Sequence, residues 1–298
     1  MTRPRPEPQQ LGLAGMPQRL FACTPSRLTT WQDCPRRYRL TYLERPAVPR
    51  GQAWAHTTVG AAVHLALARW WDEPLARRTA ATARSLLERA WPRHGAVPDG
   101  FADAGQSAQW RDRSADMVER YVAALDPADA PVAVERTVAA RTGRLALSGR
   151  VDRLDQRGDD LVVVDYKTGR HVPDEDDAHG SLALALYAVA AARTLRRRCT
   201  RVELHHLPTG RTVGADHSAA SLARQVGRAE ALADEAEAAT EALAAGGAQV
   251  DVLFPPVPSA GCAWCDHLRS CAAGRAAAGP PRRPWDGLAE TAVPDEAA

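Results

Sequence analysis

Two neighbouring segments of the sequence decide the fold: GRVDRLD at 149–155 and VVVDYKTG at 162–169. In each, apolar residues lead into or alternate with charged ones, which is typical of a β-strand. The sequence QRGD at 156–159 lies between them and has the composition of a tight turn. We therefore predict a β-hairpin, with its turn centred near residues 157–158.

The predicted hairpin gathers charged residues that suit metal chemistry. Asp165 and Lys167 are two residues apart in one strand and so share a face of the sheet. Asp152 of the other strand falls opposite Asp165, to within a residue or two. Two such carboxylates repel unless a cation lies between them, and Mg²⁺ prefers oxygen ligands of this kind. The alternative is a solvated hairpin with ordinary surface charges.

The rest of the chain predicts an α/β protein: a mixed central sheet flanked by helices, with a helical N-terminal region and a C-terminal cysteine loop. We expect a single domain over 21–275, with its helical part at about 24–128, its core at about 131–247 and its cysteine loop at about 254–272. Pro- and charge-rich ends, 1–20 and 276–298, predict disordered tails.

Within this outline, Pro35 predicts that the first helical stretch breaks at Cys34. Thr57 or Thr58 is the expected N-cap of a second helix that reaches Trp71.

The amino-acid usage of the chain is unusual. Its 298 residues include no Ile, no Asn and a single Lys, and arginine supplies nearly all of the positive charge. A lysine kept against this bias suggests that its compact, titratable charge matters, and that lysine is Lys167. The net charge of +2 neither requires nor excludes nucleic acid. With no apolar run of membrane length and no secretory signal, we expect a cytoplasmic protein that does not bind membranes.

The hairpin residues resemble the PD-(D/E)XK motif of a nuclease superfamily. The longer pattern Gly-x-x-Asp-Arg-x-Asp followed by Asp-Tyr-Lys-Thr-Gly resembles the RecB-type exonuclease branch, which has a restriction-endonuclease-like core. The resemblance implies that Asp152 and Asp165 bind Mg²⁺ or Mn²⁺, that the carbonyl of Tyr166 is a further ligand, and that Lys167 is catalytic. Lys167 would orient or activate water and offset charge in the transition state.

The same family carries supporting residues upstream. A Gly-x-x-x-His motif on a helix matches residues 60–64 and implies that His64 is a metal ligand, although a lone histidine in an apolar helix is more often a core residue. Glu135 stands where the family often has a glutamate that supports catalysis; a surface glutamate on an edge strand is the alternative. One position departs from the family: Ala183 replaces the usual Gln of Gln-x-x-x-Tyr, although Tyr187 is kept.

Four of the six cysteines have the spacing of a metal site. Cys262, Cys265 and Cys271 form C-x₂-C-x₅-C, and Cys34 lies far upstream. This split set resembles the iron–sulfur staple of AddB-type and CRISPR-associated nucleases, which implies a 4Fe-4S cluster; four thiolates would equally suit Zn²⁺. Cys23 is the main alternative for the fourth ligand.

The predicted substrate is DNA, held by side chains near the two metal sites. We expect DNA contacts from five residues: Arg36, Arg37, Arg150, Arg153 and Tyr187. A solvated face is the alternative for the arginines beside Cys34.

Together these features predict a metal-dependent DNA nuclease of repair or recombination, an exonuclease that prefers single strands or free ends. The sequence contains no P-loop, so a helicase would have to be a separate partner. Two alternatives remain: a catalytically inactive nuclease fold that binds DNA and docks onto a helicase, and a zinc-stapled scaffold.

Overall fold

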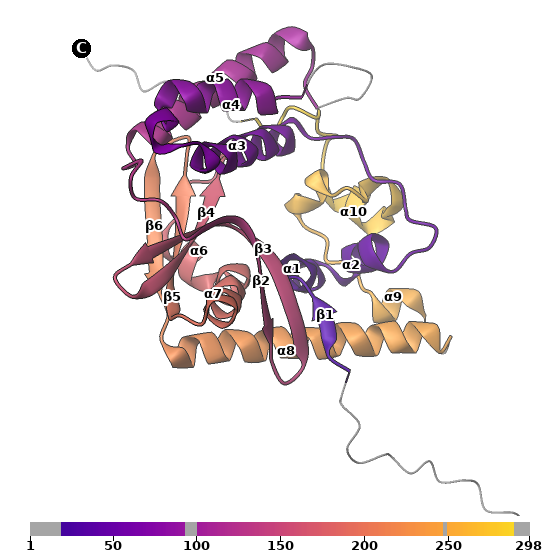
Figure 1. Ribbon diagram of the computed structural model, residues 1–298. Coiled ribbons are helices and arrows are strands. Elements are labelled where there is room, and N and C mark those ends of the chain that lie inside the picture. Colours follow the sequence, from indigo (N-terminus) through magenta and orange to yellow (C-terminus); the bar gives the residue numbers. More distant parts are fainter. Residues whose placement is uncertain (1–18, 93–99, 247–248, 289–298) are drawn as a thin grey trace, which may run out of the picture.

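The computed structural model describes residues 19–92, 100–246 and 249–288. The first described range and the start of the second contain one short strand, five α-helices and one 3-10 helix. Figure 1 shows the helices between residues 55 and 123 at one end of the sheet. The N-terminal elements are β1 (Phe21–Cys23), α1 (Pro25–Asp33), α2 (Pro35–Tyr42), α3 (Ala55–Asp72), η1 (Leu75–Arg77), α4 (Ala80–Ala90) and α5 (Ala104–Ala123).

The predicted break between the first two helices is confirmed. Cys34 has an extended backbone, with φ −165°, and Pro35 begins α2. The Cys34 sulfur accepts a hydrogen bond from the amide of Arg37 at 3.5 Å, so this cysteine caps the helix that follows it.

A six-stranded mixed sheet forms the centre of the molecule. The strands run in the order β1-β3-β4-β5-β6, and β2 pairs with the other edge of β3. The remaining strands are β2 (Ala133–Arg141), β3 (Leu145–Arg157), β4 (Asp160–Lys167), β5 (Cys199–His206) and β6 (Arg211–Asp216). The pairs β1/β3 and β4/β5 are parallel and the other pairs are antiparallel.

The β3–β4 hairpin forms as predicted, with its turn one residue later than expected. Arg153 pairs with Val164 and Arg157 pairs with Asp160, so the turn falls at residues 158–159. Gly158 adopts the left-handed φ of +59° that this turn requires. Continuing the register by one residue places Asp152 opposite Asp165.

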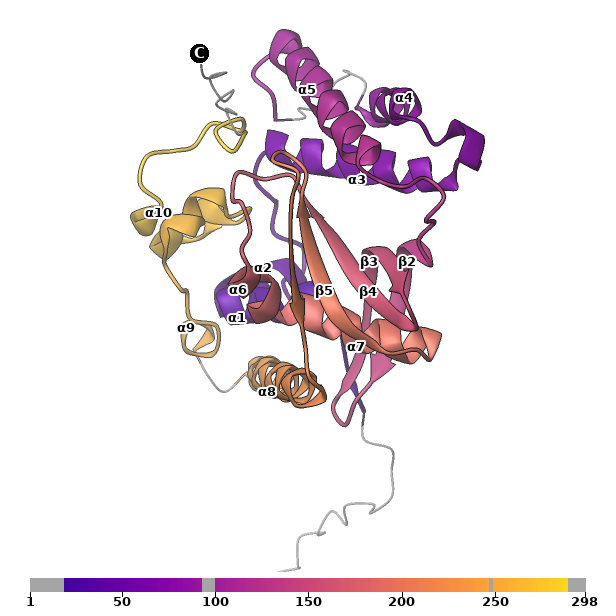
Figure 2. The same ribbon diagram turned by 90° about the vertical axis from the view of Figure 1, so that its left-hand side faces the viewer.

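Helices cover both faces of the sheet. One core joins the sheet to α1, α7 (Leu182–Leu195) and α8 (Ala219–Ala244), and the other joins it to α3, α4 and α5. Figure 2 shows α3, α4 and α5 at one end of the strands, α7 across their lower half, and α8 at the opposite end. α7 connects the parallel strands β4 and β5, as a crossover helix does. The predicted mixed α/β architecture is confirmed.

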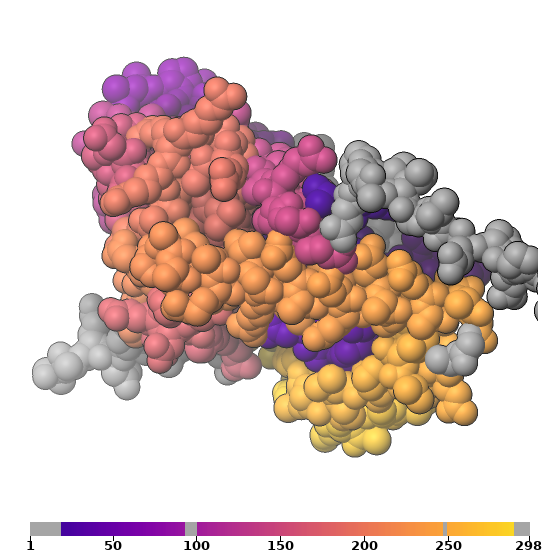
Figure 3. Space-filling view, turned by 90° about the horizontal axis from the view of Figure 1, so that it is seen from below, coloured from indigo at the N-terminus to yellow at the C-terminus, as the bar shows by residue number. Residues whose placement is uncertain are grey.

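The C-terminal part of the chain returns to the N-terminal helices. It contains α9 (Val250–Leu253), η2 (Ala260–Trp264), η3 (Leu268–Ser270) and α10 (Ala272–Ala277). Seen from below, α8 crosses the molecule and reaches the yellow C-terminal region (Figure 3). A short helix that the sequence did not predict, α6 (Glu175–Gly180), follows β4.

Two expectations about the ends change. The segment 276–288, predicted to belong to a disordered tail, is placed against α3: the Ala55 amide donates to the Pro284 carbonyl at 3.1 Å, and Leu288 is buried. This contact satisfies an amide of the first turn, so α3 begins at Ala55 and its N-cap is Trp54, not the predicted Thr57 or Thr58. The remainder of the predicted tails, 1–18 and 289–298, lies outside the described residues.

Within the three described ranges, none of the helices combines the length and apolar character needed to cross a bilayer.

Candidate metal centre and nuclease site

Three side chains from different elements converge at the start of the predicted hairpin. His64 of α3, Glu135 of β2 and Asp152 of β3 each bring a ligand atom within 4.8 Å of the others. His64 Nδ1 lies 3.3 Å from Asp152 Oδ1. Two carboxylates and an imidazole at this spacing suit a divalent cation such as Mn²⁺ or Mg²⁺. Among the described residues, no other group of histidine, cysteine or acidic side chains is this compact.

The second half of the site lies at the end of β4. Lys167 Nζ forms an ion pair with Asp165 Oδ2 at 2.6 Å, as expected for two side chains on one face of a strand. The amide of Tyr166 donates to Asp152 Oδ2 at 2.9 Å, which ties the two strands together between the carboxylates. Asp165 is turned toward Lys167 and is not one of the three residues in the compact group.

Glu135 has a feature that the sequence does not predict. Its backbone lies in the left-handed region, with φ +47°, although it sits inside β2. The left-handed conformation is about 1–2 kcal/mol less stable for a non-glycine residue, and such backbone strain is concentrated at functional sites. The bend directs its carboxylate to His64 and Asp152, and Oε2 also accepts from Arg150 Nε at 2.9 Å.

Three carboxylates, Glu135, Asp152 and Asp165, bring negative charge close together at this site. Burial raises the pKa of Asp165, and the charge of Asp152 raises it further against the opposing effect of Lys167. Burial likewise raises the pKa of Glu135. For His64, burial alone would lower the pKa, but the hydrogen bond and charge of Asp152 raise it overall. A bound cation would relieve this repulsion.

A broad cleft of about 910 Å³ opens beside the cluster. It lies between the start of α1, one side of α3, strands β2 and β3, and α7. Its polar lining comprises Thr24, Ser26, Thr57, His64, Arg69, Asp72, Glu135, Arg150, Asp152 and Tyr187.

Tyr187 reaches this cleft because β3 has no side chain in its way. A Cβ atom added to Gly149 would lie 2.6 Å from Tyr187 Cε1, so only glycine fits here. Burial raises the pKa of Tyr187, and the charges of Asp165 and Asp152 add to the effect. The tyrosine of the family pattern therefore stands near the carboxylates, while Ala183 supplies no amide.

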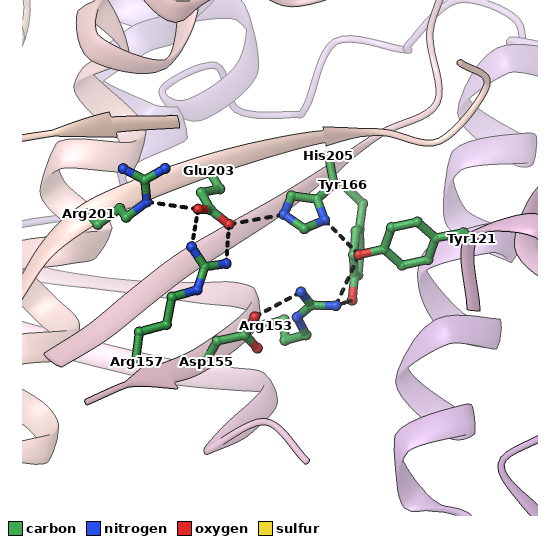
Figure 4. Close-up of polar contacts among 8 residues, drawn as sticks. All are labelled: Tyr121, Arg153, Asp155, Arg157, Tyr166, Arg201, Glu203 and His205. Atoms are coloured by element: carbon green, nitrogen blue, oxygen red, sulfur yellow. Dashed lines mark hydrogen bonds and ion pairs between the residues drawn. The ribbon is translucent and has the colours of Figure 1, made fainter. Parts of the chain in front are cut away.

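Behind the two aspartates, on the other face of the same strands, lies a buried polar network (Figure 4). Arg153 donates to Tyr121 at 3.0 Å, to Tyr166 at 3.3 Å and to Asp155 at 2.8 Å. Its side chain is only 4% exposed. This corrects the prediction that Arg153 contacts DNA: it follows Asp152 in β3 and therefore points to the opposite face of the sheet.

The network continues across β5. The Tyr121 hydroxyl lies 2.7 Å from His205 Nδ1, and His205 Nε2 lies 3.2 Å from Glu203. Glu203 is almost fully buried and is bound by both Arg157 and Arg201, as Figure 4 shows. The network thereby holds the residues that follow Asp152 and Asp165 in their strands, Arg153 and Tyr166.

The four cysteines of the predicted staple also meet. Cys34, Cys262, Cys265 and Cys271 line one small cavity between α2 and the C-terminal loop. Burial raises the pKa of Cys265, and Cys34 and Cys262 add to this effect. Cys23 is buried elsewhere, beside Arg27, and does not line the cavity.

The two arginines beside Cys34 differ in their surroundings. Arg36 is 14% exposed and pairs with Asp251 at 2.5 Å, so it is not the free DNA contact that the sequence predicts. Arg37 is exposed.

Two comparisons show what this chain is similar to. Residues 22–272 match the family model described as the PD-(D/E)XK nuclease superfamily. A crystal structure of a putative exonuclease from Eubacterium rectale is similar at 9% identity with a TM-score of 0.48, over 77% of this chain and 83% of that one. The search of curated proteins gave no match. The match to the family model covers most of the sequence, and the chain belongs to the PD-(D/E)XK nuclease superfamily.

Proposed function

We propose that the protein is a metal-dependent DNA nuclease whose active site is built from Asp152, Asp165, Lys167, His64 and Glu135. The observation that carries the proposal is the convergence of His64, Glu135 and Asp152 at the start of the hairpin, beside the Lys167–Asp165 ion pair. Three of these residues, His64, Glu135 and Asp152, line an open cleft of about 910 Å³ in which a nucleic-acid strand would lie.

The donor set fits a hard divalent cation. His64, Asp152, Asp165 and the Tyr166 carbonyl would hold Mg²⁺ or Mn²⁺, with Glu135 as a further ligand or as a partner that shapes the site. When bound, the cation supplies a Lewis acid for the scissile phosphate. Lys167 holds and orients the attacking water and offsets negative charge that develops on the phosphate oxygens.

Substrate contacts follow from the lining of the cleft. Arg150 is 69% exposed and Arg69 lies along α3, so both are placed to bind phosphates. Tyr187 offers an aromatic face to a base. We propose that the substrate is single-stranded DNA or a free DNA end, processed exonucleolytically in repair or recombination in the cytoplasm, with strand ends supplied by a separate helicase.

The test is hydrolysis of linear and closed circular single-stranded DNA with Mg²⁺, with Mn²⁺ or with a chelator. The proposal predicts metal-dependent loss of linear DNA, protection of circles, and no cleavage by Lys167→Ala. Equal cleavage of linear and circular DNA would identify an endonuclease and overturn the exonuclease proposal. DNA binding without hydrolysis in any metal would favour the alternative of an inactive DNA-binding module, which the alanine at position 183 motivates.

We further propose that Cys34, Cys262, Cys265 and Cys271 hold a 4Fe-4S cluster. The four cysteines line one cavity, and four thiolates suit either an iron–sulfur cluster or tetrahedral zinc. The split order of the cysteines, one before the nuclease core and three after it, supports the cluster.

An absorption band near about 400 nm in protein purified without oxygen tests the cluster. The band should be lost in Cys34→Ala and kept in Cys23→Ala. Stoichiometric zinc without the band would overturn the assignment.

A further inference from the structure

A second cavity, separate from the catalytic cleft and adjoining the cysteine site through Cys265, lies beside the segment that leads into α3. It has a volume of about 370 Å³, within the range of small-ligand pockets. Its walls come from the segment that leads into α3 and from the C-terminal loop, including α10. Figure 1 shows these two segments on the same side of the molecule, next to the start of α3.

The lining of the cavity carries an excess of positive charge. Arg269, Arg275 and Arg282 line it, and Asp266 is its one acidic residue. All three arginines are exposed, and none forms an ion pair with the described residues. Three guanidinium groups around one concave surface concentrate a field that attracts anions, above all phosphate.

Aromatic rings stand beside these arginines. Trp54 lines the cavity, and its ring centroid lies 5.0 Å from that of Trp264. The guanidinium of Arg282 lies over the Trp264 ring at 5.4 Å. The indole Nε1 of Trp54 is buried without a hydrogen-bond partner among the described residues. Positive charge next to aromatic faces is the combination that binds single-stranded nucleic acid, through phosphates and bases together.

We propose that this cavity binds a nucleotide of a single DNA strand whose scissile phosphate lies in the catalytic cleft. The inference rests on the proposed function. Trp54 precedes His64 by ten residues, which corresponds to about 15 Å along α3. At about 3.4 Å per stacked nucleotide, the cavity is reached about four nucleotides from the cleaved bond.

The experiment measures binding of fluorescent dT12 across a series of salt concentrations, without added divalent metal so that the strand stays intact. The wild type is compared with a triple variant, Arg269→Ala, Arg275→Ala and Arg282→Ala. The matched control removes three exposed arginines from β6 and α8: Arg211→Ala, Arg224→Ala and Arg228→Ala. Circular dichroism verifies that each variant is folded.

The cavity variant is expected to bind at least tenfold more weakly. The slope of log affinity against log salt should fall by about two, since each lost contact with a single-strand phosphate contributes about 0.7. The control should bind as the wild type does. Wild-type binding by the cavity variant, an equal loss in the control, or no binding of dT12 by the wild type would each overturn the proposal. If the cavity variant lost as much affinity for free dAMP as for dT12, the cavity would be a mononucleotide site. That result would overturn the proposal that it binds a DNA strand.

Hydrolysis of bis(p-nitrophenyl) phosphate with Mn²⁺ separates this inference from the proposed function. This ester is too small to reach the cavity from the cleft, so the cavity variant should cleave it at the wild-type rate. No cleavage by the wild type would count against the nuclease assignment, while the binding comparison would still decide whether the cavity holds a strand.

Discussion

Replacing Tyr121 by phenylalanine removes one oxygen from the centre of the buried network and keeps the ring. The ring packs edge-on against Tyr166 at 5.6 Å and His205 at 5.8 Å, and phenylalanine preserves both contacts. The hydroxyl accepts from Arg153 and bonds His205 Nδ1, so Tyr121→Phe deletes one hydrogen bond to a charged group and leaves one buried ring nitrogen unpaired.

The expected loss of stability follows from these two contacts. A hydrogen bond to a charged group contributes about 1.5–3 kcal/mol, and a buried unsatisfied polar atom costs about 1–3 kcal/mol. We therefore expect Tyr121→Phe to lower the free energy of unfolding by about 3 kcal/mol, measured by urea denaturation followed by tryptophan fluorescence. The control is Tyr42→Phe, since the Tyr42 hydroxyl has no hydrogen bond to the described residues, and it should change stability by less than about 0.5 kcal/mol.

The same variant tests whether the network positions the metal ligands. The Tyr166 hydroxyl accepts a hydrogen bond from Arg153, and the Tyr166 amide donates to Asp152. Weakening the network should therefore make the Asp152 carboxylate less firmly positioned. We expect the Mn²⁺ concentration for half-maximal hydrolysis to rise while the KM for DNA is unchanged. A stability loss no larger than that of Tyr42→Phe, with unaltered metal dependence, would refute this reasoning.

Three further outcomes follow from the structure. Glu203→Gln should lower the free energy of unfolding by about 3–5 kcal/mol at pH 7, because it breaks a buried ion pair. Burial alone would raise the pKa of Glu203, but hydrogen bonds from His205, Arg157 and Arg201 hold it far below its usual range. In urea titrations, the stability difference between the wild type and Glu203→Gln should therefore persist above about pH 4.3 and shrink below it. Glu135→Gly should relieve the left-handed strain, so the free energy of unfolding should stay unchanged or rise by up to about 1 kcal/mol. Calorimetry should record at least tenfold weaker Mn²⁺ binding by this variant. A lower free energy of unfolding would argue against backbone strain at Glu135. Gly149→Ala should cost about 1–3 kcal/mol in thermal unfolding because its methyl group meets Tyr187, and a neutral result would contradict the close packing.

The parts of the fold that local sequence determines were the predictable ones. The hairpin was readable because β-strand alternation, a turn with Gly158 and the spacing of Asp165 and Lys167 all lie within about twenty residues. The break at Cys34 was readable because proline cannot continue a helix.

The contacts that sequence reasoning missed join residues far apart in the chain. Nothing near Arg153 indicates that Tyr121 of α5 lies behind the sheet, yet strand alternation could have placed Arg153 on the face opposite Asp152. The left-handed conformation of Glu135 has no glycine or asparagine to signal it. The docking of residues 279–288 depends on the carbonyls of Arg282, Pro284 and Asp286 and on a few apolar side chains. These lie within a Pro- and Arg-rich segment, whose composition alone favours disorder.

The most direct test of the central claim is single-turnover hydrolysis of end-labelled single-stranded DNA with Mn²⁺ by protein purified without oxygen. Wild type is compared with Asp165→Ala and Lys167→Ala, each verified as folded. The account predicts metal-dependent cleavage by the wild type and a loss of at least about 100-fold in both variants. Undiminished cleavage by both variants, or none by folded wild type with Mn²⁺ or Mg²⁺, would contradict it.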